Sequence, residues 1–206
     1  KKKKKKTSAK DPNCPIPRLK TRYNEFVKPA LQAKFGFKNA METPRITKIV
    51  ASMGIGDAND NPKKFDQLLG NLEVMTGQRP QVTRSRVSVA NFKLREGMVV
   101  GCRSTLRRAR MWEFMDRLLT VVVPRMRDFR GLKTKSFDGR GNYAMGLPDQ
   151  LVFPDINADR VEFYNGINIV VCTTATTDEH ALELLRLMGF PFTDLTVEVI
   201  GIKEGA

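Results

Sequence analysis

Residues 46–76, ITKIVASMGIGDANDNPKKFDQLLGNLEVMT, contain a strand pattern, a glycine turn and a helix pattern in direct succession. Ile46 to Met53 is rich in β-branched and apolar residues and is bounded by Pro44 and Gly54, which predicts a strand. Gly77 and Pro80 mark the end of the helix that follows. Apolar residues spaced at i, i+3, i+4, i+7 and i+10 give this helix one buried side: Phe65, Leu68, Leu69, Leu72 and Met75.

Similar patterns extend outward from this stretch. Leu19 to Phe35 has helical spacing, but Pro29 predicts a kink or two short helices. Pro124 is expected to end a second helix, and Thr177 to cap the last one. Further strands are predicted at 81–83, 99–106, 167–174 and 195–202, further helices at 111–122 and 177–188, and an irregular glycine-rich region at 131–148.

Strands and helices alternate without forming regular βαβ units. This favours an α+β fold, in which helices pack on one face of a largely antiparallel sheet and leave the other face free. Residues 84–98 lie between two predicted strands and are too polar and basic for a core. Long connections of this kind are uncommon in compact domains and tend to be functional, so we expect a long basic loop that projects toward a partner.

Positive charge is concentrated in two zones of the chain, whose formal net charge is +14. Lys1–Arg22 holds ten basic residues and one acidic residue, and Arg79–Arg110 holds nine basic residues against the single Glu96. By contrast, Gly141–Ala206 holds three basic and ten acidic residues. This segregation favours a surface that binds a polyanion over a uniformly solvated one.

The N-terminal lysine run cannot bury apolar surface, so we expect residues 1–18 to form an extended basic arm. The arm either binds a polyanion or only solvates the chain. The three cysteines are widely spaced, which predicts free thiols in a reducing compartment. Neither a membrane-spanning run nor a signal peptide is predicted, so we expect a soluble intracellular protein. The cysteines are Cys14, Cys102 and Cys172.

Residues suited to catalysis are scarce. The only histidine, His180, is expected to be exposed at the start of a helix among acidic residues. Gly54 and Gly56 follow a strand, as in a phosphate-binding turn, but Asn59 replaces the third glycine and no lysine of the Walker type follows. The alternative is that these glycines only permit a tight turn. We therefore expect no enzymatic activity, cofactor, metal or small-molecule substrate.

Arginine dominates the second basic zone, with eight arginines to one lysine. A guanidinium binds phosphate through two hydrogen bonds and stacks on bases, so this composition favours specific nucleic-acid contact. Phe92, within the long loop, is either a base-stacking residue or an anchor folded back on the core. The composition also leaves two other classes open: a nucleotide-using enzyme built around Gly54 and Gly56, and a general architectural DNA-binding protein.

An ordered series of motifs resembles the family of bacterial-type large-subunit ribosomal protein five, the 5S rRNA-binding protein. The resemblance runs from about Tyr23 to Phe192, and SFDGRGNY is especially distinctive. The motifs are TPRITKIV, MGIGDA, TGQRP, NFKLREGM, TLRRARMWEF, VPRMRDFRGL, SFDGRGNYAMG and FPDI.

The resemblance implies a structural constituent of the large ribosomal subunit, located in the cytoplasmic ribosome. Its sheet and adjoining turns would bind 5S rRNA and anchor it in the central protuberance, alongside large-subunit rRNA. Gln78 and Thr105 match positions that hydrogen-bond 5S rRNA, whereas Ser52 stands where the family usually has asparagine. Neighbouring Arg103 and Arg107 complete the expected rRNA-binding set.

Two further contacts are implied by the same resemblance. The loop from Arg84 to Phe92 would approach the tRNA in the peptidyl site through Arg84, Arg86, Ser88 and Asn91. The region from Arg130 to Asn142 would face small-subunit protein thirteen through Arg130, Arg140 and Asn142. The expected domain boundaries are a basic arm over 1–18, the 5S rRNA-binding domain over 19–192 and a C-terminal extension over 193–206.

Overall fold

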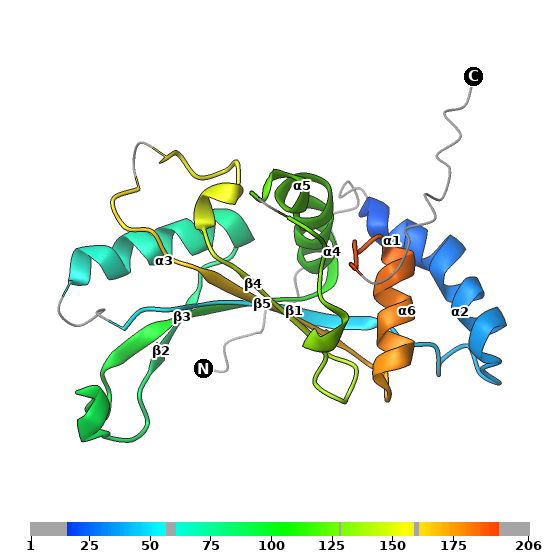
Figure 1. Cartoon of the computed structure of the whole chain (residues 1–206), viewed down its shortest axis with the longest axis horizontal. Helices are drawn as coiled ribbons and strands as arrows, with labels where there is room; N and C mark the ends of the chain where they lie inside the picture. The colour runs from blue at the N-terminus through cyan, green and yellow to red at the C-terminus, as the bar shows by residue number, and fades with distance from the viewer. Residues whose placement is uncertain (1–15, 57–60, 128, 159–160, 194–206) are drawn as a thin grey trace, which may run out of the picture.

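A computed structural model describes residues 16–56, 61–127, 129–158 and 161–193 (Figure 1). Its centre is a five-stranded sheet with strand order β2-β3-β1-β5-β4, in which every neighbouring pair is antiparallel. This arrangement confirms the predicted α+β class. The strands are β1 (Ile46–Gly54), β2 (Gln81–Arg84), β3 (Val99–Leu106), β4 (Tyr143–Leu147) and β5 (Ile167–Thr173).

The helices lie above the sheet and at one of its ends. Figure 1 shows α3, α4 and α5 above the strands, with α1, α2 and α6 grouped to the right. The α-helices are α1 (Arg18–Arg22), α2 (Lys28–Phe35), α3 (Pro62–Thr76), α4 (Arg108–Arg117), α5 (Val123–Arg125) and α6 (Asp178–Met188). Short π-helical and 3-10 turns accompany them in the described ranges: η1 (Tyr23–Val27), η2 (Ala90–Phe92), η3 (Leu118–Val122), η4 (Thr134–Ser136) and η5 (Gln150–Val152).

The sheet has one buried face and one face that no described helix covers. Along β1, Ile49, Ala51 and Met53 are buried and belong to a core cluster shared with residues of all the longer helices. Val50 and Ser52 alternate with them and are only partly buried, because successive side chains of a strand point to opposite faces. The alternation in β5 follows the prediction, with Ile167, Ile169 and Val171 buried. We call the uncovered side the open face.

Prolines within two of the helices each follow a π-helical turn. Pro29 is the second residue after η1, and Pro124 is the second residue after η3. Because proline donates no N–H and its ring crowds the carbonyl four residues earlier, a widened turn can accommodate it. The predicted irregularity at Pro29 is therefore a π turn. The prediction that the second helix ends at Pro124 is wrong, since α5 continues to Arg125.

The region 131–148, predicted to be irregular, contains strand β4. Tyr143, Met145 and Leu147 are buried, whereas Ala144 and Gly146 are exposed, so the strand does alternate. The prediction missed it because small residues on the exposed side hide this periodicity and glycine is uncommon within strands. As the edge strand next to β5, β4 completes the sheet.

One predicted helix cap differs in the structure, and two predicted segments lie wholly or partly outside the described residues. Thr177 does occupy the N-cap position of α6, but its side chain makes no capping hydrogen bond. Residues 1–15 of the predicted arm and 194–206, including the strand predicted at 195–202, are not described. Within the described ranges, none of the helices is long and apolar enough to cross a membrane.

Candidate nucleic-acid interface

The strand register aligns polar side chains in a row across the open face. Ser52 on β1 pairs with Arg103 on β3 and with Asn168 on β5. The same row continues outward to Gln81 on β2 and Gly146 on β4. Residues that are direct partners across strands point to the same face, so this row lies wholly on the open side. Two of the predicted rRNA-binding residues, Ser52 and Arg103, are thus neighbours.

The open face carries positive charge without negative charge. Its two basic residues are Lys48 and Arg103, and none of the strand residues that point to this face in the described structure is acidic. Such a surface attracts a polyanion. The residues on this face are Gln81, Thr83, Gly101, Arg103, Thr105, Lys48, Val50, Ser52, Gly54, Asn168, Val170, Cys172, Ala144 and Gly146.

Gln78 and Thr105, two of the predicted rRNA-binding residues, meet at the edge of this face. The Gln78 Nε2 atom donates to the backbone oxygen of Thr105 at 3.4 Å, and Arg110 Nη1 approaches Gln78 Oε1 at 3.5 Å. Both distances are long for hydrogen bonds, so the amide keeps capacity for a better partner. Arg110 was part of the basic stretch noted in the sequence, but its approach to Gln78 depends on the fold.

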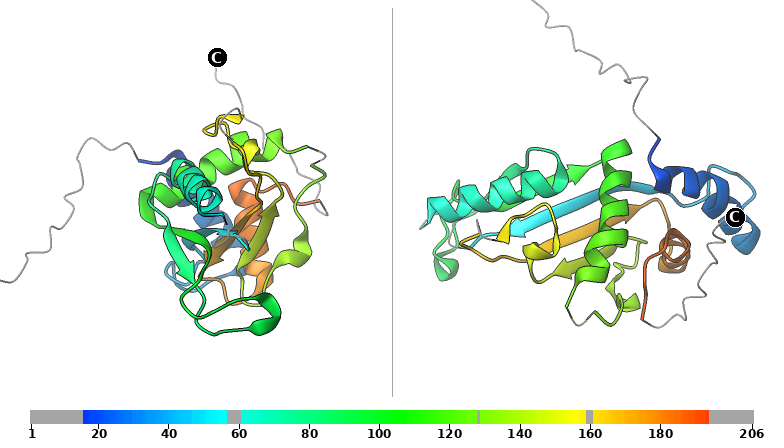
Figure 2. Two further views of the ribbon diagram at one scale, coloured as in Figure 1. Left: turned by 90° about the vertical axis from the view of Figure 1, so that its left-hand side faces the viewer. Right: turned by 90° about the horizontal axis from the view of Figure 1, so that it is seen from above.

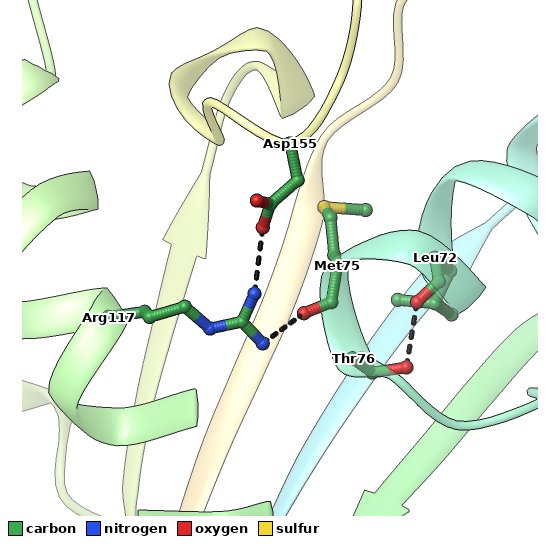
Figure 3. Close-up of polar contacts among 5 residues, drawn as sticks. All are labelled: Leu72, Met75, Thr76, Arg117 and Asp155. Carbon is green, nitrogen blue, oxygen red and sulfur yellow. Dashed lines mark hydrogen bonds and ion pairs between the residues drawn. The ribbon is translucent and has the colours of Figure 1, made fainter. Parts of the chain in front are cut away.

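The turn that carries Gln78 is held by contacts at the end of α3 (Figure 3). Thr76 Oγ1 donates to the backbone oxygens of Leu72 at 2.7 Å and Gln78 at 3.0 Å. From α4, Arg117 donates to the Met75 backbone oxygen at 3.0 Å and pairs with Asp155 at 2.7 Å. The Arg117 bond satisfies the Met75 carbonyl, which the helix end would leave unpaired, and together these contacts keep the Gln78 turn in place.

Arg107 lies where β3 passes into α4, next to the predicted contact Thr105. It occupies the N-cap position with extended backbone and is exposed. Arg108 follows with φ 57°, a left-handed conformation that costs a non-glycine residue energy. Unfavourable backbone of this kind often marks a functional position. The junction therefore directs consecutive cationic side chains away from the core.

The connection between β2 and β3, residues 85–98, is a hydrogen-bonded finger. Its two sides are joined by Ser85 N to Met98 O at 2.8 Å, and by reciprocal bonds between Val89 and Leu94. Arg84 Nη1 donates to Gly97 O at 2.9 Å, and Ser88 Oγ accepts from Glu96 N at 3.0 Å. The hydroxyl of Ser88 thus serves the finger's own backbone, whereas Arg86 and Asn91 are exposed.

The finger carries exposed apolar side chains. Phe92 is 74% exposed and Val87 is 66% exposed. This excludes the alternative in which Phe92 anchors the loop on the core, and base stacking by Phe92 stays a prediction. Figure 2 shows the finger extending away from the body of the molecule.

Two carboxylates order the loop that carries Arg140 and Asn142. Asp178 at the start of α6 accepts from Gly139 N at 3.1 Å and from Gly141 N at 2.8 Å. Asp138 accepts from the backbone N–H groups of Arg140 and Asn142 and from Asn142 Nδ2. These hydrogen bonds, with that from the Asn142 side chain first, lower the pKa of Asp138.

Within this loop the two predicted contact residues differ in availability. The Asn142 amide bonds Asp138 and also accepts from Thr173 N at 3.2 Å, so it supports the loop. Arg140 is exposed. Arg130 is also exposed but lies beside Leu132, which pairs with Phe192 after α6. Arg130 therefore belongs to a segment anchored apart from the loop of Arg140.

The histidine and the buried cysteine of the described residues both pack against neighbouring side chains. His180 is not solvent-exposed as predicted, because its ring packs edge-on against Phe35 and Phe37 at centroid distances of 4.4 and 5.2 Å. Burial raises the pKa of the Cys102 thiol to about 11, so it stays protonated and unreactive at neutral pH. Among the residues described, no cluster of His, Cys, Asp and Glu could hold a metal ion.

Gly54 and Gly56 do not form a left-handed turn. Neither has a positive φ, and Gly54 ends β1 opposite Gly101. A Cβ atom at Gly101 would lie 2.3 Å from the Met53 backbone oxygen. Glycine at position 101 therefore permits the close approach of β3 to β1, whereas a Cβ atom at Gly54 or Gly56 would meet nothing within 4 Å.

Comparisons with known proteins identify the same family in both halves of the chain. The family model described as Ribosomal protein L5 matches residues 39–95, and the model for the C-terminus of the same ribosomal family matches residues 99–192. The large ribosomal subunit protein uL5 of Alkaliphilus oremlandii is 54% identical over 175 residues, covering 85% of this chain and 98% of that protein. Those of Clostridium tetani and Clostridium perfringens strain 13 are 51% and 50% identical, covering 86% and 85% of this chain and 98% of each relative.

Proposed function

This chain belongs to the ribosomal protein L5 family, a family of structural, non-enzymatic constituents of the large ribosomal subunit, and on that premise we propose that it binds 5S rRNA through its open face. Binding would anchor 5S rRNA in the central protuberance against large-subunit rRNA. The observation that carries the proposal is the alignment of Ser52, Arg103 and Asn168 on a face free of carboxylates among the described strand residues.

The chemistry of this face suits a folded RNA. Hydroxyl and amide groups can bond both ribose 2′-OH groups and phosphate oxygens, and guanidinium groups pair with phosphates. Gln78, Thr105 and Arg107 extend the row at the junction of β3 with α4. A DNA-binding protein would not need donors and acceptors for the 2′-OH, so RNA is the better partner.

The proposal predicts that changing Gln78 and Thr105 to alanine together weakens 5S rRNA binding by roughly fivefold or more per lost hydrogen bond. The measurement is an equilibrium titration of labelled 5S rRNA at physiological salt, with unrelated RNA of equal length as competitor. A matched control, Gln32→Ala with Thr177→Ala, changes the same residue types on α2 and before α6. Equal affinity of the test and control variants would refute the site.

The finger is proposed to contact tRNA in the peptidyl site. Arg86 and Asn91 are exposed on it, and Phe92 offers an aromatic ring near the tip. In this proposal Arg84 and Ser88 contribute mainly by fixing the finger, since both bond its backbone. Its hydrogen-bonded shape would lower the entropy lost when it docks.

The segment from Arg130 to Asn142 is proposed to contact small-subunit protein thirteen across the subunit interface. Arg140 would supply the exposed cation, and Asn142 would hold the loop. Residues 1–18 are proposed as an RNA-binding arm, 19–192 as the rRNA-binding domain and 193–206 as an extension. Polycationic segments bind best where phosphates crowd, which supports this division.

A further inference from the structure

The side chains of the open face include no aromatic ring among the residues that the structure describes. The exposed aromatic residues Phe26, Phe92 and Tyr164 lie on a helical segment, on the finger and in the connection before β5. Sheets that bind unpaired nucleotides use aromatic side chains as platforms on which bases stack. This face therefore lacks the main means of holding a single strand.

The open face is also shallow. Gly54 and Gly101 are paired on β1 and β3, and Gly146 lies opposite Asn168 with Ala144 two residues before it. A Cβ atom added at Gly146 would lie 3.5 Å from Asn168 Oδ1, so even a small side chain there would contact the amide. Small residues allow a broad, rigid partner to approach the backbone of the sheet.

The polar row matches the dimensions of a duplex groove. Neighbouring strands lie about 4.8 Å apart, so Arg103, Ser52 and Asn168 span roughly 10 Å across three strands. The major groove of B-form DNA, which admits protein elements, is of similar width, about 12 Å. In A-form RNA the wide, shallow groove is the minor groove, which displays 2′-hydroxyl groups and base edges.

Asn168, unlike Arg103 and Ser52 in this row, was not among the predicted rRNA contacts. Its side chain is exposed, and it forms no hydrogen bond with the described residues. An amide both donates and accepts, as a 2′-hydroxyl does, so the two groups can pair in either direction. On the other side of Ser52, Arg103 is oriented by Gln81, whose Oε1 accepts from its Nε and Nη2 at 3.4 Å.

We propose that the open face binds a base-paired RNA segment along its minor groove and that Asn168 is a contact residue for its ribose hydroxyls. The inference rests on the proposed rRNA-binding function of this face and specifies the form of RNA that it takes. Arg103 would pair with a phosphate at the groove margin, while Ser52 and Asn168 would face the sugars.

The test uses the full chain and 5S rRNA into which 2′-deoxynucleotides have been incorporated at random positions. Bound and free RNA are separated, and positions where the missing hydroxyl reduces binding are mapped. We expect these positions to cluster in paired nucleotides on facing sides of a minor groove. Asn168→Ala should weaken binding roughly three- to tenfold and abolish the effect at a subset of them.

Controls separate this inference from the proposed function. Asn24→Ala, which changes an exposed asparagine on η1, should bind as the unchanged chain does. Asn168→Asp keeps the side-chain size, so it provides a second variant if Asn168→Ala does not fold, and its charge should weaken binding further. The inference would be overturned if the positions where a missing 2′-hydroxyl reduces binding lay mainly in unpaired nucleotides. It would also be overturned if both Asn168 variants kept the same affinity and the same set of positions. Absence of any preference for 5S rRNA over unrelated RNA would instead refute the proposed function.

Discussion

At the scale of single residues, the groups next to the proposed contacts are held by side chains that do not themselves face a partner. Thr76 and Arg117 secure the turn before Gln78, and Asp138 and Asp178 secure the loop of Arg140. Charged acceptors on backbone N–H groups form stronger hydrogen bonds than neutral ones. The positions of Gln78 and Arg140 therefore depend on hydrogen bonds made by these neighbouring side chains.

The lowered pKa of Asp138 makes the stability of its loop depend on pH. A depressed folded-state pKa stabilises the protein above the unfolded pKa of about 3.9, and this contribution is lost as the pH falls through the folded-state pKa. Asp138→Asn should therefore lower the free energy of unfolding at neutral pH. The difference from the unchanged chain should shrink as the pH falls below about 4.

Urea unfolding at a series of pH values measures this difference. Asp66→Asn, which changes an exposed carboxylate on α3, controls for the general effect of removing a negative charge. A difference that stays constant from neutral to acidic pH would show that the ionised Asp138 carboxylate does not support the loop.

At the scale of elements, the finger between β2 and β3 combines an ordered backbone with exposed apolar side chains. Residues 85–98 form hydrogen bonds from their base to η2, yet Phe92 and Val87 contact little of the protein. Exposing a phenylalanine ring has no benefit for folding. Its position is instead consistent with stacking on a base of the partner.

Replacing Phe92 by alanine should weaken binding of tRNA to the peptidyl site of reconstituted ribosomes. A base stacked on an aromatic ring contributes about 1–3 kcal/mol, which corresponds to a loss of roughly 5- to 150-fold. The melting temperature of the free protein should not fall, because the ring is 74% exposed. Phe92→Trp should retain binding and Val87→Ala serves as the control; equal tRNA affinity in all three variants would exclude stacking.

At the scale of the whole molecule, the chain separates basic from acidic segments. Ten of the basic residues precede Tyr23 and nine lie between Arg79 and Arg110, whereas the acidic residues dominate after Gly141. The open face receives Arg103 from the second of these zones, and the finger receives Arg86, Lys93 and Arg95 from it. Folding thus places the second basic zone on two adjacent surfaces.

Removing residues 1–18 distinguishes an RNA-binding arm from a solvating tail. Each phosphate neutralised by the arm should contribute roughly 0.7–0.9 to the slope of log affinity against log salt concentration. We therefore expect a shallower slope for the shortened chain in titrations of large-subunit rRNA. Removing residues 194–206, which carry more acidic than basic residues, should not make the slope shallower. An unchanged slope without residues 1–18 would favour the tail.

Local patterns predicted most of the elements because their periodicity reflects burial on one side. The stripe of Leu68, Leu72 and Met75 lies on the core side of α3, and the alternation of Ile167, Ile169 and Val171 lies on the core side of β5. Strand β4 was not predicted because its exposed residues, Ala144 and Gly146, are small and not polar, so the alternation with the buried residues is hard to recognise. His180 was misplaced because its packing partners, Phe35 and Phe37, are far away in the sequence.

The sequence by itself determined the fold class, the family and the basic character of the partner-binding segments, since these depend on periodicity, motif order and charge. Only the tertiary structure decided that Ser52 pairs with Arg103 and Asn168, that Gln78 reaches Thr105, and that Phe92 is exposed. The physical reason is strand register: a shift of one residue would turn each strand side chain to the other face, and register is set by packing of the whole core.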